Sequence, residues 1–117
     1  MPTFDEAEDF LAETIGSLPP DIIKGLNGGV ILLPDTILDK DGLIVLGLYH
    51  VQPMGLGRYI TIHFGSLTKA YGHLSKRGFE KKLREVLYHE LTHHLENQAG
   101  DHSLEIQDAI DKAHYLS

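Results

Sequence analysis

Two histidines and a glutamate stand in the sequence at the spacing of a zinc site. They are His89, Glu90 and His93, which spell His-Glu-x-x-His. Residues four apart lie on the same side of an α-helix, one turn along it, so both imidazoles can bind one metal ion. Glu90 lies beside them and can take a proton from water, whose pKa zinc lowers from about 15.7 towards 7. The spacing therefore predicts metal-assisted hydrolysis.

The residues around this motif repeat with the period of an amphipathic helix, which we expect to run from about 79 to 99. Its apolar stripe contains Phe79, Leu83, Val86, Leu87 and Leu91. Its polar side contains Lys81, Arg84, Glu85 and Tyr88. Glu90 and His94 fall inside the stripe, where a carboxylate is costly without a cation or a proton. This favours a metal site over two solvated histidines with a glutamate that has no role.

A third protein ligand is expected, because catalytic zinc sites usually bind three side chains and leave one position open. We favour Glu105, which lies on a helix predicted over 103–115 that must fold back beside the motif helix. Asp108 follows on the same face and can accept the outer N–H of a ligand histidine. Glu96 and Asp101 are the alternatives. Glu105 and Asp108 would also complement the dipole of a first helical turn.

Composition excludes several classes of protein. The 117 residues suffice for one domain, and the absence of cysteine excludes a disulfide scaffold, a thiolate zinc site and a cysteine nucleophile. The net charge of −7 argues against nucleic acid and anionic membranes as partners. No apolar run approaches the roughly 20 residues of a membrane-spanning helix, and the N-terminus is acidic where a secretory signal is basic. A cytoplasmic protein is therefore expected.

The remaining segments predict a mixture of helices and strands. Thr3 and Glu6 form the capping box of a first amphipathic helix that ends before Pro19. Strands are expected over 30–33, 43–49 and 58–64, with a loop over 35–42, a short helix over 65–73, and Gly47 at a bulge or close approach.

The strand over 58–64 alternates cleanly between two faces. One face carries Ile60, Ile62 and Phe64. The other is expected to be wetter and carries Tyr59, Thr61 and His63.

Three stretches carry a resemblance to a known family, and it spans essentially the whole length. They are Leu46-Gly47-Leu48-Tyr49, Arg58-Tyr59-Ile60-Thr61-Ile62 and His89-Glu90-Leu91-Thr92-His93-His94. The chain resembles the minimal zincin-like metallopeptidases, small bacterial single-domain proteins. This implies an α+β fold with a minimal zincin-like core: a short mixed sheet of about three to four strands on the motif helix, with N-terminal and C-terminal helices.

The sequence departs from other members of that family after the second motif histidine. Those members have glycine where Glu96 stands, followed by an aspartate that is read as the third ligand. Here Asp101 arrives two positions late, which makes it a rival to Glu105.

The leading hypothesis is therefore a zinc metallopeptidase that acts on a peptide or an unfolded protein, with Glu90 as general base. The strand over 58–64, if it is a sheet edge, could hold an extended substrate by strand addition. The main alternative is a non-catalytic metal-binding module that binds a partner protein. A third is a metal-free helical interaction domain, whose stability chelators leave unchanged. Iron, cobalt, manganese and nickel also suit such ligands.

Overall fold

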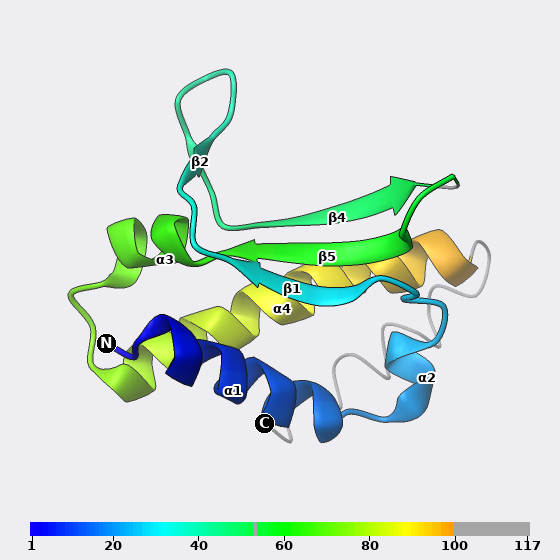
Figure 1. Cartoon of the computed structure of the whole chain (residues 1–117), viewed down its shortest axis with the longest axis horizontal. Helices are drawn as coiled ribbons and strands as arrows, with labels where there is room; N and C mark the ends of the chain where they lie inside the picture. Colours follow the sequence, from blue (N-terminus) through cyan, green and yellow to red (C-terminus); the bar gives the residue numbers. More distant parts are fainter. Residues whose placement is uncertain (53, 100–117) are drawn as a thin grey trace.

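The computed structural model of the protein describes residues 1–52 and 54–99, so the helix predicted over 103–115 lies outside the described part. The elements in chain order are α1 (Phe4–Gly16), α2 (Pro20–Ile23), β1 (Gly29–Leu33), β2 (Ile37–Leu38), β3 (Ile44–Val45), β4 (Gly47–Gln52), β5 (Gly57–His63), α3 (Phe64–Tyr71) and α4 (Lys76–Ala99) (Figure 1). No helix in these residues is long and apolar enough to cross a membrane.

The main sheet has three strands in the order β1-β5-β4. β1 runs parallel to β5, and β4 runs antiparallel to it. This confirms the expected α+β class with a short mixed sheet. It also corrects one expectation: β5 is the central strand, and the edge strands are β1 and β4. Alternation along a sequence cannot distinguish the two positions, because a central strand shows the same period as an edge strand.

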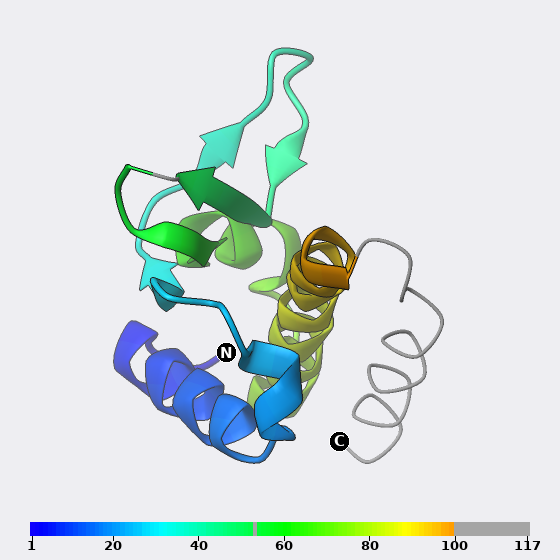
Figure 2. The same ribbon diagram turned by 90° about the vertical axis from the view of Figure 1, so that its right-hand side faces the viewer.

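The helices α1 and α4 pack against one face of this sheet (Figures 1 and 2). That face carries Val30 and Leu32 from β1 and Ile60 and Ile62 from β5. α4 contributes buried Phe79, Leu83, Leu87, Leu91 and Leu95 to the same hydrophobic core. The motif helix therefore lies directly beneath the sheet, with its apolar stripe turned towards it.

The motif helix starts earlier and is buried over a wider arc than the sequence predicts. It begins at Lys76, since the Ser75 hydroxyl accepts a hydrogen bond from the Gly78 N–H at 3.1 Å and caps the first turn. Tyr88, predicted on the polar side, is only 5% exposed and belongs to the core. The reason is that α4 contacts α1 and α2 as well as the sheet, so more than one of its sides is covered.

The segment predicted as a loop over 35–42 contains a strand. β2 pairs antiparallel with β3, and together they form a hairpin that projects from the sheet (Figure 1). The single strand predicted over 43–49 is divided at Leu46, which separates β3 from β4.

The face of β5 that the alternation predicts to be wetter is buried. Tyr59, Thr61 and His63 are 9%, 6% and 2% exposed. Side chains of two neighbouring strands shield a central strand, and the polar atoms here bond to one another. Nε2 of His63 lies 3.0 Å from the Thr61 hydroxyl oxygen, and its Nδ1 lies 2.6 Å from Oδ1 of Asp35.

Candidate metal centre and cleft

The side chains of His89 and His93 point towards each other on the exposed side of α4. Their Nε2 atoms are 3.2 Å apart, and their rings are nearly perpendicular, at 87°. Both residues are exposed on α4, one turn apart. The helix alone produces this arrangement, because the i and i+4 side chains share a face.

The separation of these two nitrogens suits a zinc ion. Two ligands at about 2.0–2.1 Å from a tetrahedral zinc lie about 3.3 Å from each other. His89 and His93 would therefore hold the ion with little rearrangement. Among residues 1–52 and 54–99, no third histidine or carboxylate joins them in a group that could hold a metal ion.

The candidates for the third ligand are placed as follows. Glu105, Asp101 and Asp108 lie outside the described residues. Glu96 lies on the exposed side of α4, with its carboxylate 4.0 Å from Nδ1 of His93. That nitrogen is the one that does not face His89, and at this distance the two groups are not hydrogen-bonded.

Glu90 lies beside the histidine pair, under the edge strand β4. It is 6% exposed, and burial raises the pKa of its carboxyl group, against an opposing effect from His89 and His93. The Glu90 carboxylate fits beneath β4 because the strand residue above it is Gly47, which has no side chain. A Cβ at Gly47 would lie 2.8 Å from Cγ1 of Val86 and 3.2 Å from Cγ of Glu90. The close approach expected at Gly47 is therefore confirmed.

Two hollows meet at this point and form a cleft between β4 and α4. The first, of about 420 Å³, is lined by Ile44, Val45, Leu46, Gly47, Tyr71, Lys82, Glu85, Val86, His89 and Glu90. The second, of about 660 Å³, is lined by Gly47, Leu48, Tyr49, Val51, His89, Glu90, His93, Glu96 and Asn97. They share Gly47, His89 and Glu90, so the motif lies midway along the cleft.

The edge strand β4 turns unpaired backbone groups towards solvent along this cleft. The His63 N–H donates to the Leu46 carbonyl at 2.9 Å, which makes these two residues a hydrogen-bonded pair. Such pairs alternate along an antiparallel ladder. With the observed register, Gly47, Tyr49 and Val51 therefore direct their N–H and C=O groups away from β5. No other strand in the described part of the chain pairs with them.

The third histidine of the motif is a structural residue. His94 is fully buried; its Nε2 lies 2.8 Å from the Lys24 carbonyl, and its Nδ1 lies 2.8 Å from the Tyr49 hydroxyl. A carbonyl only accepts, so Nε2 carries the proton and Tyr49 donates to Nδ1. Burial lowers the pKa of His94, which keeps the ring neutral. With both nitrogens bonded, His94 joins α4 to β4 and to the segment after α2.

Comparisons with known proteins give one informative likeness. No protein-family model matches the sequence, and no curated protein matches it. The structure is similar to that of a conserved hypothetical protein from T. thermophilus, with a TM-score of 0.70 and 28% sequence identity. The match covers 85% of this chain and 99% of that one. It supports the small α+β fold.

Two tyrosines of the cleft are not singled out by the sequence. Tyr49 lines the cleft and anchors His94, while the sequence places it only within a strand. The signal is present in the spacing, since Tyr49 lies two residues after Gly47 and so shares its face of β4. Tyr71 falls within the short helix predicted over 65–73, and in the structure it lines the first hollow. Tyr59 and His63 lie on the opposite face of the sheet.

Proposed function

We propose that the protein is a zinc-dependent peptidase. The observation that carries the proposal is the convergence of the His89 and His93 Nε2 atoms at 3.2 Å, beside a buried Glu90 and beneath an open strand edge. His89 and His93 would hold the ion together with a carboxylate from Glu105, Asp101 or Glu96. When bound, zinc supplies a Lewis acid that polarises a carbonyl and lowers the pKa of water.

Residues of the chain itself supply the general base and hold it in position. Glu90 accepts the proton of the attacking water at its carboxylate and passes it to the amide nitrogen that leaves. Burial raises the pKa of this carboxyl group, and a cation bound beside it would favour the charged form that accepts a proton. Gly47 lies above Glu90 and permits the close approach of β4, and the Tyr49 hydroxyl holds the strand to α4 through its hydrogen bond with His94.

The substrate suggested by the cleft is an extended polypeptide that pairs with β4. The outward backbone groups of Gly47, Tyr49 and Val51 offer main-chain hydrogen bonds over about five residues of peptide. This replaces strand addition at β5, which is enclosed by its two neighbours. Main-chain pairing suits an unfolded chain or a short peptide, because a folded substrate has already used these groups.

The first test is metal content in protein produced in zinc-replete medium. We expect about one zinc per wild-type chain and loss of that zinc in His93→Ala. His73→Ala is the matched control, since His73 is exposed just before α4 and lines neither hollow of the cleft. A wild-type protein that takes up no zinc, with no stabilisation on its addition, contradicts the proposal.

The second step of the same test is turnover of a peptide library. Glu90→Gln should retain zinc and lose roughly 10²- to 10⁴-fold in kcat, the usual contribution of a general base. Zinc binding without cleavage of any peptide by the wild type would favour the non-catalytic metal-binding module instead.

A further inference from the structure

Most of the exposed apolar side chains in the described part of the chain belong to one segment, from the β2–β3 hairpin to the turn after β4. Among residues 1–52 and 54–99, eight large apolar residues are exposed, and seven of them lie on the β2–β3 hairpin, on β4 or in the turn after it. They are Leu38, Leu43, Ile44, Leu48, Val51, Met54 and Leu56. Single exposed apolar residues need no explanation, but several on one hairpin and the strand that follows it make this segment a candidate interaction surface. We call these seven residues the apolar strip.

The hairpin presents its part of the strip on a tight turn. The Asp39 carboxylate accepts hydrogen bonds from the N–H groups of Asp41 and Leu43 at 2.8 and 2.9 Å. Gly42 has a φ of +81°, which other residues adopt only with strain. Leu43 is 64% exposed and Leu38 52%. The turn thus holds two leucines in solvent on an ordered support.

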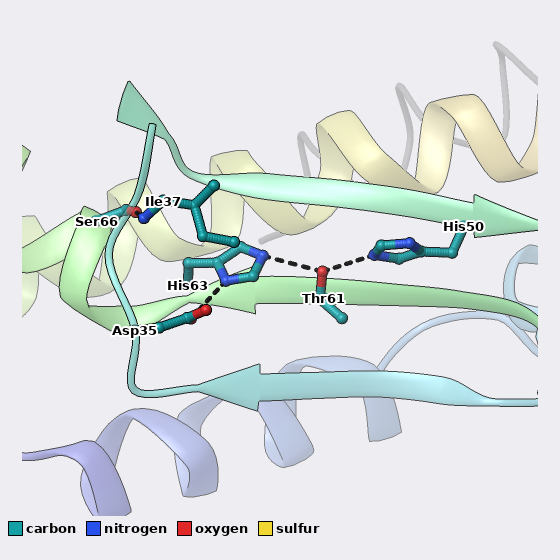
Figure 3. Close-up of polar contacts among 6 residues, drawn as sticks. All are labelled: Asp35, Ile37, His50, Thr61, His63 and Ser66. Carbon is teal, nitrogen blue, oxygen red and sulfur yellow. Dashed lines mark hydrogen bonds and ion pairs between the residues drawn. The ribbon is translucent and has the colours of Figure 1, made fainter. Parts of the chain in front are cut away.

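The base of the hairpin is fixed to the sheet and to α3 (Figure 3). The Ile37 N–H donates to the Ser66 hydroxyl at 2.9 Å, and Asp35 lies 2.6 Å from Nδ1 of buried His63. Thr61 continues this chain of contacts by bridging His63 and His50. The hairpin therefore stands at a set angle to β5, as an arm and not as a loose loop.

The arm continues directly into the cleft. Ile44 belongs to the strip and also lines the hollow that contains His89 and Glu90. Beyond Leu46 the same segment becomes β4, whose outward groups face the cleft. A polypeptide paired with β4 and extended past Gly47 would therefore reach the arm.

We propose that the β2–β3 hairpin is an arm that grips an extended, apolar stretch of the substrate, on the side of the cleft where β4 begins. This inference rests on the proposed function and specifies its substrate class. Leu38, Leu43 and Ile44 provide apolar contacts beyond those of the three outward residues of β4. Acidic substrates are disfavoured, because the chain carries a net charge of −7 and the tip contains Asp39 and Asp41.

The test measures the binding of neutral fluorescent peptides of increasing length, extended with leucine and valine at one end or the other. The protein is zinc-loaded Glu90→Gln, so that cleavage does not interfere with the measurement. Peptides long enough to reach the arm should bind about tenfold more weakly when Leu43→Ser is added, as loss of one buried leucine contact implies. Peptides that span only β4 should bind equally to both proteins. Leu43→Met should restore affinity. Ala12→Ser, at an exposed position of α1 that lines neither hollow of the cleft, is the control.

Each outcome decides a different point. Equal binding of long peptides to the Leu43→Ser protein overturns the arm, even if the wild type cleaves them, and leaves the peptidase proposal standing. A loss confined to long peptides supports the arm, and if the wild type cleaves none of them, only the peptidase proposal fails. A dimer in light scattering that Leu43→Ser dissociates would make the strip a contact between two copies and overturn the arm.

Discussion

At the scale of single residues, the three motif histidines differ in role because their surroundings differ. His89 and His93 are exposed with Nε2 atoms that face each other, so these atoms are available to an ion. His94 is one residue further on, and the 100° step of the helix turns it into the core. Its two nitrogens are already bonded there. The neighbouring residues His93 and His94 therefore have different roles: His93 is available to a metal ion, and His94 supports the fold.

Replacing His94 should lower stability without removing the metal. We expect His94→Ala to reduce the free energy of unfolding by roughly 2–4 kcal/mol, because it leaves a cavity and removes the hydrogen bonds to Tyr49 and to the Lys24 carbonyl. Zinc content of the folded protein should stay near one per chain, whereas His93→Ala should lose zinc. Urea denaturation together with elemental analysis measures both.

Tyr49→Phe supplies the control if His94→Ala folds poorly, since it removes the same hydrogen bond from the other partner. Its cost should be about 1 kcal/mol. Loss of zinc from either variant in its folded form would mean that His94 takes part in the metal centre.

At the scale of elements, the cleft depends on how closely β4 approaches α4. The strand lies over Glu90 because Gly47 has no Cβ, while Tyr49 reaches down to His94 two residues later. A glycine and a tyrosine on one face of one strand thus set the spacing on the two sides of the motif.

A methyl group at Gly47 should impair catalysis more than metal binding. In Gly47→Ala the new Cβ would meet Val86 at 2.8 Å and Glu90 at 3.2 Å, so the strand or the carboxylate must shift. A misplaced general base should lower kcat/KM by about 10- to 100-fold. Zinc content should be unchanged, because His89 and His93 lie on the exposed side of the helix. Peptide cleavage assays and metal analysis test this expectation.

Gly16→Ala is the matched control for this variant. Its added Cβ would have no heavy atom within 4 Å, and its backbone does not require glycine. Normal activity in Gly47→Ala would show that the approach of strand and helix has no part in positioning Glu90.

At the scale of the whole molecule, the start of the first helix is tied to the start of the last described one. Glu6 accepts a hydrogen bond from the Thr3 N–H at 3.0 Å and one from Lys76 at 2.9 Å. The Thr3 N–H, followed by Lys76, lowers the pKa of Glu6 from 4.5 to about 2. The contact therefore joins the N-terminal ends of α1 and α4 through a carboxylate that stays charged in mild acid.

This pKa shift predicts part of the acid sensitivity of the fold. The folded-state pKa lies below the unfolded value, so the contribution of Glu6 is complete above about pH 4.5 and is lost as the pH falls towards about 2. Glu6→Gln should flatten the decline of the urea midpoint across that window. Glu8→Gln, on the exposed side of the same helix, serves as the control. Parallel pH profiles for Glu6→Gln and wild type would exclude a contribution from the contact.

Local patterns were sufficient for much of this molecule. The capping box of α1, the glycine at the strand–helix approach and the burial of Glu90 and His94 were predicted and are confirmed. The capping box depends on contacts within a few residues, and the burial of Glu90 and His94 depends on the period of the helix; at Gly47 the residue type alone indicated the approach, and its partners Val86 and Glu90 come from the distant helix α4. The geometry of His89 and His93 likewise depends on the period of the helix, because one turn of helix brings their side chains together.

Only the tertiary structure decided which strand forms the edge, which faces are buried and where the cleft lies. The central place of β5 comes from pairing on both of its sides, and the burial of Thr61 and His63 follows from it. The bond from Ile37 to Ser66, 29 residues apart, and the bond from His94 to Lys24, 70 residues apart, likewise depend on distant segments meeting. A sequence states the period of an element, but it does not state its neighbours. Burial and strand availability are properties of neighbours, so these features emerge only when the chain is folded.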